Sequence, residues 1–129
     1  MKRSLRAFSL VEVLAAVAII GIIVFLALPN VIQAKRDTEE QMVTTRAEAL
    51  NMAMSSYITA NGRSNAGGTW TGSLSHPDKY NLIKAYMAYA PTNLSDYQPS
   101  GYTFEFGTLE QKVTVKRNLG GGTTEVIPY

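Results

Sequence analysis

The sequence of 129 residues has no cysteine and a single histidine, His76. The lack of cysteine excludes disulfide bonds, a thiolate nucleophile and thiolate metal sites. A single histidine excludes zinc sites built from histidine clusters and any chemistry that needs two imidazoles. An excess of charge of one sign is also missing, because twelve basic and ten acidic residues leave a net charge of +2. That charge is too small to predict nucleic acid as a partner. The length fits one domain with at most an appendage.

What the sequence does have is a long apolar run near its N-terminus. Residues Val13–Leu28 include no charged or strongly polar side chain. The run extends back to Phe8, interrupted only by Ser9 and Glu12, and then covers 21 residues. As a helix with about 1.5 Å per residue it is roughly 31 Å long, close to the ~30 Å hydrocarbon core of a bilayer. The run therefore predicts a single membrane-spanning helix.

The residues that flank the run predict its orientation. The run itself fits three kinds of segment: a secretory signal peptide, a plain membrane anchor and a segment specific to one protein family. Basic residues precede it, which places the N-terminus in the cytoplasm and the bulk of the chain outside; these are Lys2, Arg3 and Arg6. A secretory signal peptide also starts with basic residues, but its apolar part is usually about 7–15 residues long. A glutamate inside the run and the lack of a good cleavage site near Ala34 also speak against a signal peptide. A plain membrane anchor and a family-specific segment stay open.

Glu12 is the residue that favours the family-specific segment. An ionisable residue in a membrane helix is a functional-site hypothesis, because a lone buried carboxylate is expensive and a carboxylate paired with an ammonium is much less so. The stretch Arg6-Ala7-Phe8-Ser9-Leu10-Val11-Glu12-Val13-Leu14 resembles the class III leader junction of type IV pilins and of type II secretion pseudopilins.

This resemblance implies a site at the junction. A prepilin peptidase would cut between Ala7 and Phe8 and then methylate the new amine of Phe8. Glu12 matches the family acid that pairs with the terminal amine and sets the register of subunits in the filament. Gly21 and Pro29 match the helix-weakening glycine and proline of the family helix, although a simple kink at the membrane exit explains Pro29 equally well.

Further residues are similar to the major pseudopilins, and two positions depart from the pattern. The similar positions are Pro29-Asn30, Leu50, Ala53, Tyr57 and Asn61-Gly62-Arg63. Ala7 stands before the cut where the family normally has glycine, and Ser64-Asn65 follows where an aromatic-proline pair is common. The resemblance divides the chain into a leader at 1–7, an apolar transmembrane or filament-core helix at 8–30, and a periplasmic head at 31–129.

The remainder predicts a small α+β head. Apolar residues at helical spacing extend one helix from about Phe8 to Ala60, with its second half as a wall of the head; they are Val43, Ala47, Leu50, Met54 and Tyr57. We expect a loop at 62–75 with Trp70 as its packing anchor, a helix at 77–89 capped by Ser75, and a loop at 90–101. Alternating apolar residues after position 101 predict a three-stranded antiparallel sheet packed on the long helix, with turns at Gly107-Thr108 and at 118–122.

The sequence predicts a structural protein and not an enzyme. Ser75, His76 and Asp78 are too close along the chain to adopt the geometry of a catalytic triad. No cofactor or metal site is expected, and nucleic acid is not an expected partner. The expected partners are further copies of the chain or related subunits, the prepilin peptidase and an inner-membrane assembly platform. A type II secretion pseudopilin is the favoured interpretation; the alternatives are a minor or competence-type pilin, and a membrane-anchored binding module that never polymerises.

Overall fold

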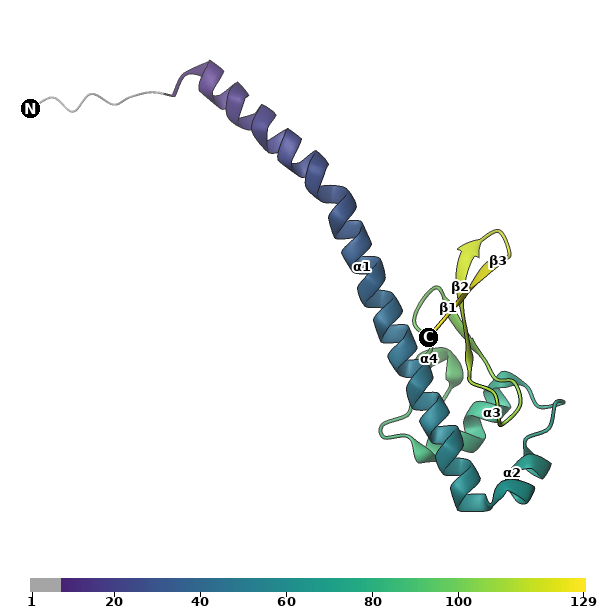
Figure 1. Cartoon of the computed structure of the whole chain (residues 1–129). Coiled ribbons are helices and arrows are strands. Elements are labelled where there is room, and N and C mark those ends of the chain that lie inside the picture. The colour runs from purple at the N-terminus through teal and green to yellow at the C-terminus, as the bar shows by residue number, and fades with distance from the viewer. Residues whose placement is uncertain (1–7) are drawn as a thin grey trace, which may run out of the picture. The chain divides into compact units, whose positions relative to one another are not determined.

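The computed structural model describes residues 8–129 (Figure 1). A long helix comes first, short helices follow, and a sheet ends the chain, which confirms the predicted α+β class. In chain order the elements are α1 (Leu10–Asn61), α2 (Arg63–Thr69), α3 (His76–Ile83), η1 (Lys84–Tyr86), α4 (Leu94–Tyr97), β1 (Tyr102–Glu105), β2 (Thr114–Gly120) and β3 (Thr123–Ile127). The residues up to Thr38 form one compact unit and Glu39–Tyr129 form a second. We call them the N-terminal unit and the head and describe each by itself.

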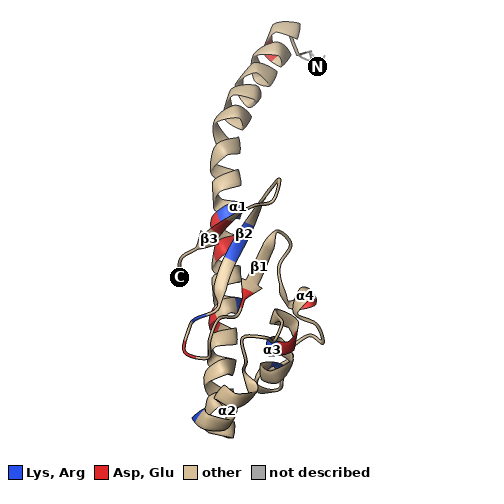
Figure 2. Cartoon of the chain, turned by 90° about the vertical axis from the view of Figure 1, so that its right-hand side faces the viewer, with Lys and Arg blue, Asp and Glu red and all other residues tan. Residues whose placement is uncertain are grey.

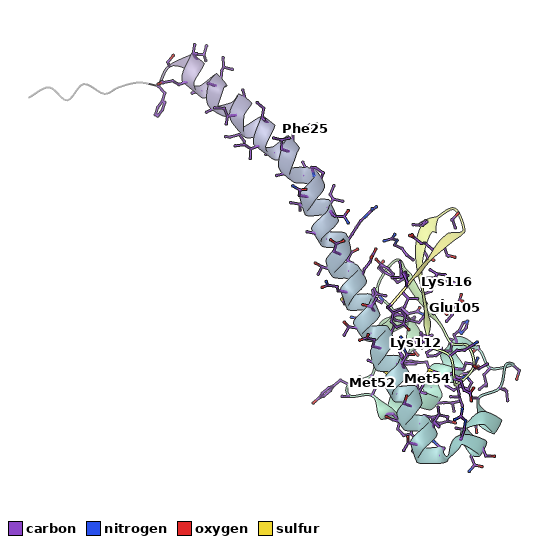
Figure 3. The ribbon with its side chains drawn as sticks, viewed as in Figure 1. Phe25, Met52, Met54, Glu105, Lys112 and Lys116 are labelled. Atoms are coloured by element: carbon purple, nitrogen blue, oxygen red, sulfur yellow. The ribbon has the colours of Figure 1, made fainter. Side chains whose placement is uncertain are left out.

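The part of α1 that lies in the head supplies one wall of the core. All five residues of the predicted apolar stripe are buried, which confirms the stripe. Met54 is 3% exposed, whereas Met52 is 71% exposed and lies on the opposite side of α1 (Figure 3). α1 ends at Asn61 because Gly62 adopts a positive φ of 75°, a conformation that glycine takes without strain.

The sheet is an antiparallel meander with the order β1-β2-β3, as predicted. Phe104 of β1 lies opposite Val115 of β2, which lies opposite Ile127 of β3. These three side chains are buried and form the face of the sheet that joins the core. β2 continues to Gly120, further than predicted, because Asn118 still pairs with Thr124. The turn itself is short and uses the positive φ angles at 120–122.

The predicted loop at 62–75 is wrong in its first half, because Arg63–Thr69 form the helix α2. Two glycines and three uncharged polar residues in this stretch favour a loop, but tertiary contacts outweigh that preference. Ala66 is fully buried and Trp70, one turn later, is 7% exposed. The Trp70 ring lies 6.4 Å from that of Tyr57 and 5.8 Å from that of Phe106. The expectation that Trp70 is a packing anchor is confirmed.

The helix predicted at 77–89 is shorter than expected. Ser75 caps α3 as predicted, with its hydroxyl oxygen accepting a hydrogen bond from the backbone N–H of Asp78 at 3.4 Å. α3 ends at Ile83, and Tyr80 and Ile83 are its buried apolar residues. The chain then tightens into η1 and leaves the helical path, so Tyr89 is fully exposed and does not join an apolar face. The segment predicted as a loop at 90–101 contains the single-turn helix α4.

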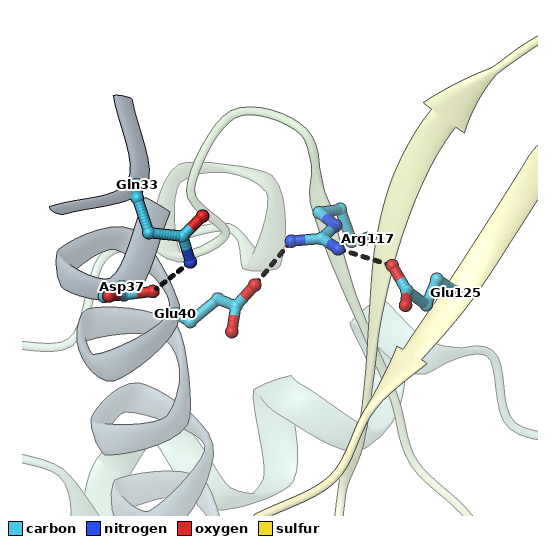
Figure 4. Close-up of polar contacts among 5 residues, drawn as sticks. All are labelled: Gln33, Asp37, Glu40, Arg117 and Glu125. Carbon is cyan, nitrogen blue, oxygen red and sulfur yellow. Dashed lines mark hydrogen bonds and ion pairs between the residues drawn. The ribbon is translucent and has the colours of Figure 1, made fainter. Parts of the chain in front are cut away.

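Basic side chains on β2 are paired with carboxylates. Arg117 forms ion pairs with Glu40 of α1 and Glu125 of β3 (Figure 4). Lys116 forms an ion pair with Glu105 of β1 across the sheet, at 2.7 Å (Figure 3). These pairs neutralise the basic residues of β2 that a phosphate backbone would otherwise contact.

Candidate functional site: the methylation junction and its helix

The first turn of α1 is organised by Ser9 and Glu12. The Glu12 carboxylate accepts a hydrogen bond from the backbone N–H of Ser9 at 2.9 Å, and the Ser9 hydroxyl oxygen accepts one from the N–H of Val11 at 3.3 Å. The carbonyl oxygen of Ser9 accepts the first helical bond, from the N–H of Glu12 at 3.0 Å. This arrangement is a variant of the capping box, in which the Glu12 side chain satisfies the backbone donor of Ser9 and the Ser9 hydroxyl satisfies that of Val11, the second helical residue.

The capping box explains why α1 begins at Leu10 and not at Phe8. It also turns the Glu12 carboxylate back along the chain, toward the residue that follows Phe8. Glu12 was predicted as a site residue, whereas the capping role of Ser9 was not predicted. The signal was available, because a serine three residues before a glutamate at the start of an apolar run is a helix-start pattern.

The two residues of the predicted cleavage junction differ in what the structure tells about them. Ala7 lies outside the described residues. Phe8 is 86% exposed and precedes the helix, so an enzyme that reads the junction would meet an accessible side chain.

The apolar part of α1 exposes its side chains all around the helix. Every residue from Phe8 to Ala34 is exposed, and large apolar residues such as Phe25 are 80% exposed (Figure 3). In Figure 2 this stretch carries no charged residue beyond Glu12 near its start. α1 is the helix within residues 8–129 that is long and apolar enough to cross a membrane. A helix that is apolar on all sides needs lipid or other helices around it.

Gly21 and Pro29 both lie inside the helical range of α1. A Cβ atom at Gly21 would meet nothing within 4 Å, so no contact in the described chain demands glycine there. Pro29 has no N–H, which leaves the carbonyl oxygen of Phe25 one turn earlier without its helical donor. The weakening of the helix during assembly that these two residues imply stays a prediction.

The head contains a buried ammonium, that of Lys79, which serves packing. Lys79 is 5% exposed; its ammonium donates to the carbonyl oxygens of Phe106 at 3.2 Å and Gly107 at 3.1 Å and lies 5.5 Å from the centre of the Trp70 ring. The indole N–H of Trp70 donates to the same Gly107 oxygen at 2.9 Å. The backbone N–H of Phe106 donates to Nδ1 of His76 at 3.1 Å. We call these three side chains the 106–107 clamp, because together they fix the chain where it leaves β1.

Burial raises the pKa of three phenols in the head, those of the buried Tyr80 and of the half-buried Tyr97 and Tyr129. The charge of nearby Arg46 lowers the pKa of Tyr97 in part, against the larger effect of burial. No three histidine or carboxylate side chains gather into a metal-binding group anywhere in residues 8–129.

Comparison with known families bears directly on this N-terminal segment. Residues 2–28 match the prokaryotic N-terminal methylation motif. The chain carries a pilin-like N-terminal methylation motif. The matched segment covers the junction, Glu12 and Gly21, and it supports the pilin-like interpretation over a plain anchor. The motif and the apolar helix together suggest membrane anchoring. No match was found among curated proteins or among solved structures.

Proposed function

We propose that this chain is a structural, non-enzymatic subunit of a type IV pilus-like filament, of the type II secretion pseudopilin kind. The precursor is inserted in the inner membrane with its head outside, cut between Ala7 and Phe8, and methylated on the amine of Phe8. The observation that carries the proposal is the methylation motif on an apolar helix whose Glu12 carboxylate turns back toward the junction.

The chemistry of the junction supports this sequence of events. In the precursor, the capping hydrogen bond from Ser9 partly satisfies the Glu12 carboxylate. Cleavage creates an ammonium at Phe8, four residues before that carboxylate. When apolar helices bundle, the amine of one subunit meets Glu12 of its neighbour, and both charges leave water as a pair. Because a mispaired charge in lipid is costly, this contact selects one register between subunits.

The charge of the mature chain is consistent with a filament that does not attract nucleic acid in bulk. Cleavage would remove three of the twelve basic residues and leave nine against ten acidic ones. The basic side chains of β2 are also already paired.

The test is mass spectrometry of the intact chain and of its N-terminal peptide, taken from membranes of the native host. We expect a chain that begins at Phe8 and carries one additional methyl group. As a matched control, Ala7→Leu places a bulky residue before the cut and should leave a chain that begins at Met1. If the unaltered chain begins at Met1, it is a membrane anchor; if it begins near Asp37, it is a secreted head. Either result would overturn the filament proposal.

A further inference from the structure

Tyr89 stands alone on the surface of the head. Its side chain is fully exposed, and within residues 8–129 it takes part in no hydrogen bond or ring contact. Its φ is +56°, and it is the one residue other than glycine in the described chain with a positive φ. An aromatic residue in this backbone region is strained, whereas glycine would not be. An exposed, strained tyrosine therefore contributes nothing visible to the stability of its own subunit.

The loop that carries Tyr89 is anchored on both sides. The ammonium of Lys84 donates to the carbonyl oxygen of Thr92 at 3.2 Å, and the hydroxyl of Tyr80 donates to that of Pro91 at 2.8 Å. Met87 packs against the core on the other side of Tyr89. The tip is thus held in place, and a side chain presented on a preorganised loop loses little entropy when it is buried by a partner.

The head also has a cavity of about 480 Å³, lined by Ile58, Arg63, Gly67, Leu109 and Glu110. Its apolar residues are Ile58 and Leu109. Arg63 and Glu110 form an ion pair with side chains 79% and 68% exposed, and such an exposed pair is weak enough to open. The volume lies in the range of roughly 300–1,000 Å³ that binds small ligands, so one aromatic side chain fits.

The cavity lies between α1, α2 and the segment that follows β1. Gly67 belongs to α2, and a Cβ atom there would meet nothing within 4 Å. Leu109 and Glu110 follow the segment fixed by the 106–107 clamp. No residue of the Tyr89 loop lines the cavity. In Figure 1 the loop between α3 and α4 extends to the left of α1, whereas α2 lies to its right.

We propose that Tyr89 of one subunit inserts into this cavity of the next subunit. The ring packs on Ile58 and Leu109, and the guanidinium of Arg63 stacks on its face. The phenol O–H donates to the carboxylate of Glu110. Tyr89, the knob, and the cavity lie on different surfaces of the same chain. Each subunit can therefore bind the Tyr89 of one neighbour in its cavity and place its own Tyr89 in the cavity of another. Such a heterologous contact grows into a helical filament when its rotation does not close a ring. This contact rests on the proposed function, since it concerns heads brought together in a filament.

The first test places the photoreactive residue benzoylphenylalanine at position 89 of the full chain in the native host. The substitution keeps an aromatic ring on the loop. After illumination we expect a ladder of subunit cross-links, with the bound peptides containing residues 58–67 or 109–110 of the second copy. The matched control carries the same residue at Met52, which is also exposed. It should give no cross-link to this cavity.

The outcomes separate this contact from the proposed function. Filaments with a methylated Phe8 whose position 89 cross-links to lipid, to another protein or to another part of the head would overturn the contact and leave the filament intact. An unaltered chain that forms no filament would overturn the proposed function, and missing subunit cross-links from the variant with benzoylphenylalanine at position 89 would overturn the contact.

A second test uses variants on both sides of the contact. Tyr89→Ala removes the knob and Gly67→Leu fills the cavity, and each should lower the yield of sheared filaments about thirtyfold, the effect of truncating an interface hot spot. Tyr89→Phe keeps the ring and should assemble nearly normally. Both positions are exposed, so the unfolding midpoint of the head, followed by Trp70 fluorescence, should stay unchanged. Normal assembly of Gly67→Leu would show that the cavity is not the receiving site.

Discussion

Glu12 has two roles in the proposed filament, and single substitutions can separate them. As a hydrogen-bond acceptor it caps α1 through the N–H of Ser9. As a charge it would neutralise the amine of a neighbouring Phe8. Glu12→Gln keeps an amide oxygen that can accept from Ser9 and removes the charge. Glu12→Ala removes both roles, and Ser9→Ala removes only the hydroxyl half of the capping box.

The two roles differ in size. Loss of an N-cap side chain costs about 1 kcal/mol, which is about a fivefold change in an equilibrium. Removal of the Glu12 charge leaves the amine of the neighbouring Phe8 unpaired. An unpaired charge at the centre of a membrane helix costs about 3 kcal/mol on insertion scales, which is about a 150-fold change in an equilibrium. We therefore expect Ser9→Ala to lower filament yield about fivefold. Glu12→Gln should lower it about 150-fold, and Glu12→Ala should lower it at least as much.

The assay compares filaments sheared from cells with the chain left in membranes, by quantitative immunoblot. Mass spectrometry on the same membranes must show that each variant begins at a methylated Phe8, so that a loss of assembly is not a loss of processing. Assembly of Glu12→Gln at the level of the unaltered chain, with Glu12→Ala defective, would refute the charge pairing. The carboxylate would then act as a helix cap alone.

Two predictions concern the head. Lys79→Met should lower the unfolding free energy of the head by about 2–3 kcal/mol, because two charge-assisted hydrogen bonds are lost and the Phe106 oxygen stays buried without a donor. Urea titration of the detergent-solubilised chain, followed by Trp70 fluorescence, measures this loss. The control Lys84→Met loses one exposed hydrogen bond and should cost below about 1 kcal/mol. The head should also lose stability in alkali, because burial raises the folded-state pKa of Tyr80, Tyr97 and Tyr129 above the usual 10.0. The unfolded chain therefore releases these protons first as pH rises. Their contribution is complete below pH 10 and is lost as pH rises through the folded-state values; an unfolding midpoint that stays level from pH 9 to 11.5 would contradict it.

The parts of the fold that follow from periodic patterns were predictable. The stripe from Val43 to Tyr57 repeats at helical spacing, and each of its residues is buried. The alternation around Phe104 and Val115 predicted strands that do pair, in the predicted order. In both cases one face of one element meets the core, so local sequence carries the information.

The parts that depend on contacts between distant segments were not predictable. The sequence of α2 predicts a loop, because its glycines disfavour a helix. The burial of Ala66 and Trp70 against other elements stabilises the helix that is observed. Burial of Lys79 has no sequence signal, since an isolated lysine usually lies on the surface. The spacing of Leu82, Tyr86 and Tyr89 fits one face of a helix, but the helix predicted at 77–89 in fact ends at Ile83.

Asn51 of α1 is hydrogen-bonded to two late segments of the chain, and this has a consequence for the time at which the head can fold. The Asn51 side chain accepts from the N–H of Val113 at 2.9 Å and donates to the hydroxyl of Tyr129 at 3.2 Å, across 62 and 78 positions of sequence. Seventy-two residues follow Tyr57, the last residue of the apolar stripe, up to and including Tyr129. At about 5–20 residues per second their synthesis takes roughly 4–15 s, whereas helix formation takes microseconds or less. The apolar stripe of α1 therefore stays exposed for seconds on each nascent chain. During that interval a chaperone or the translocation channel can bind the stripe and keep the head unfolded.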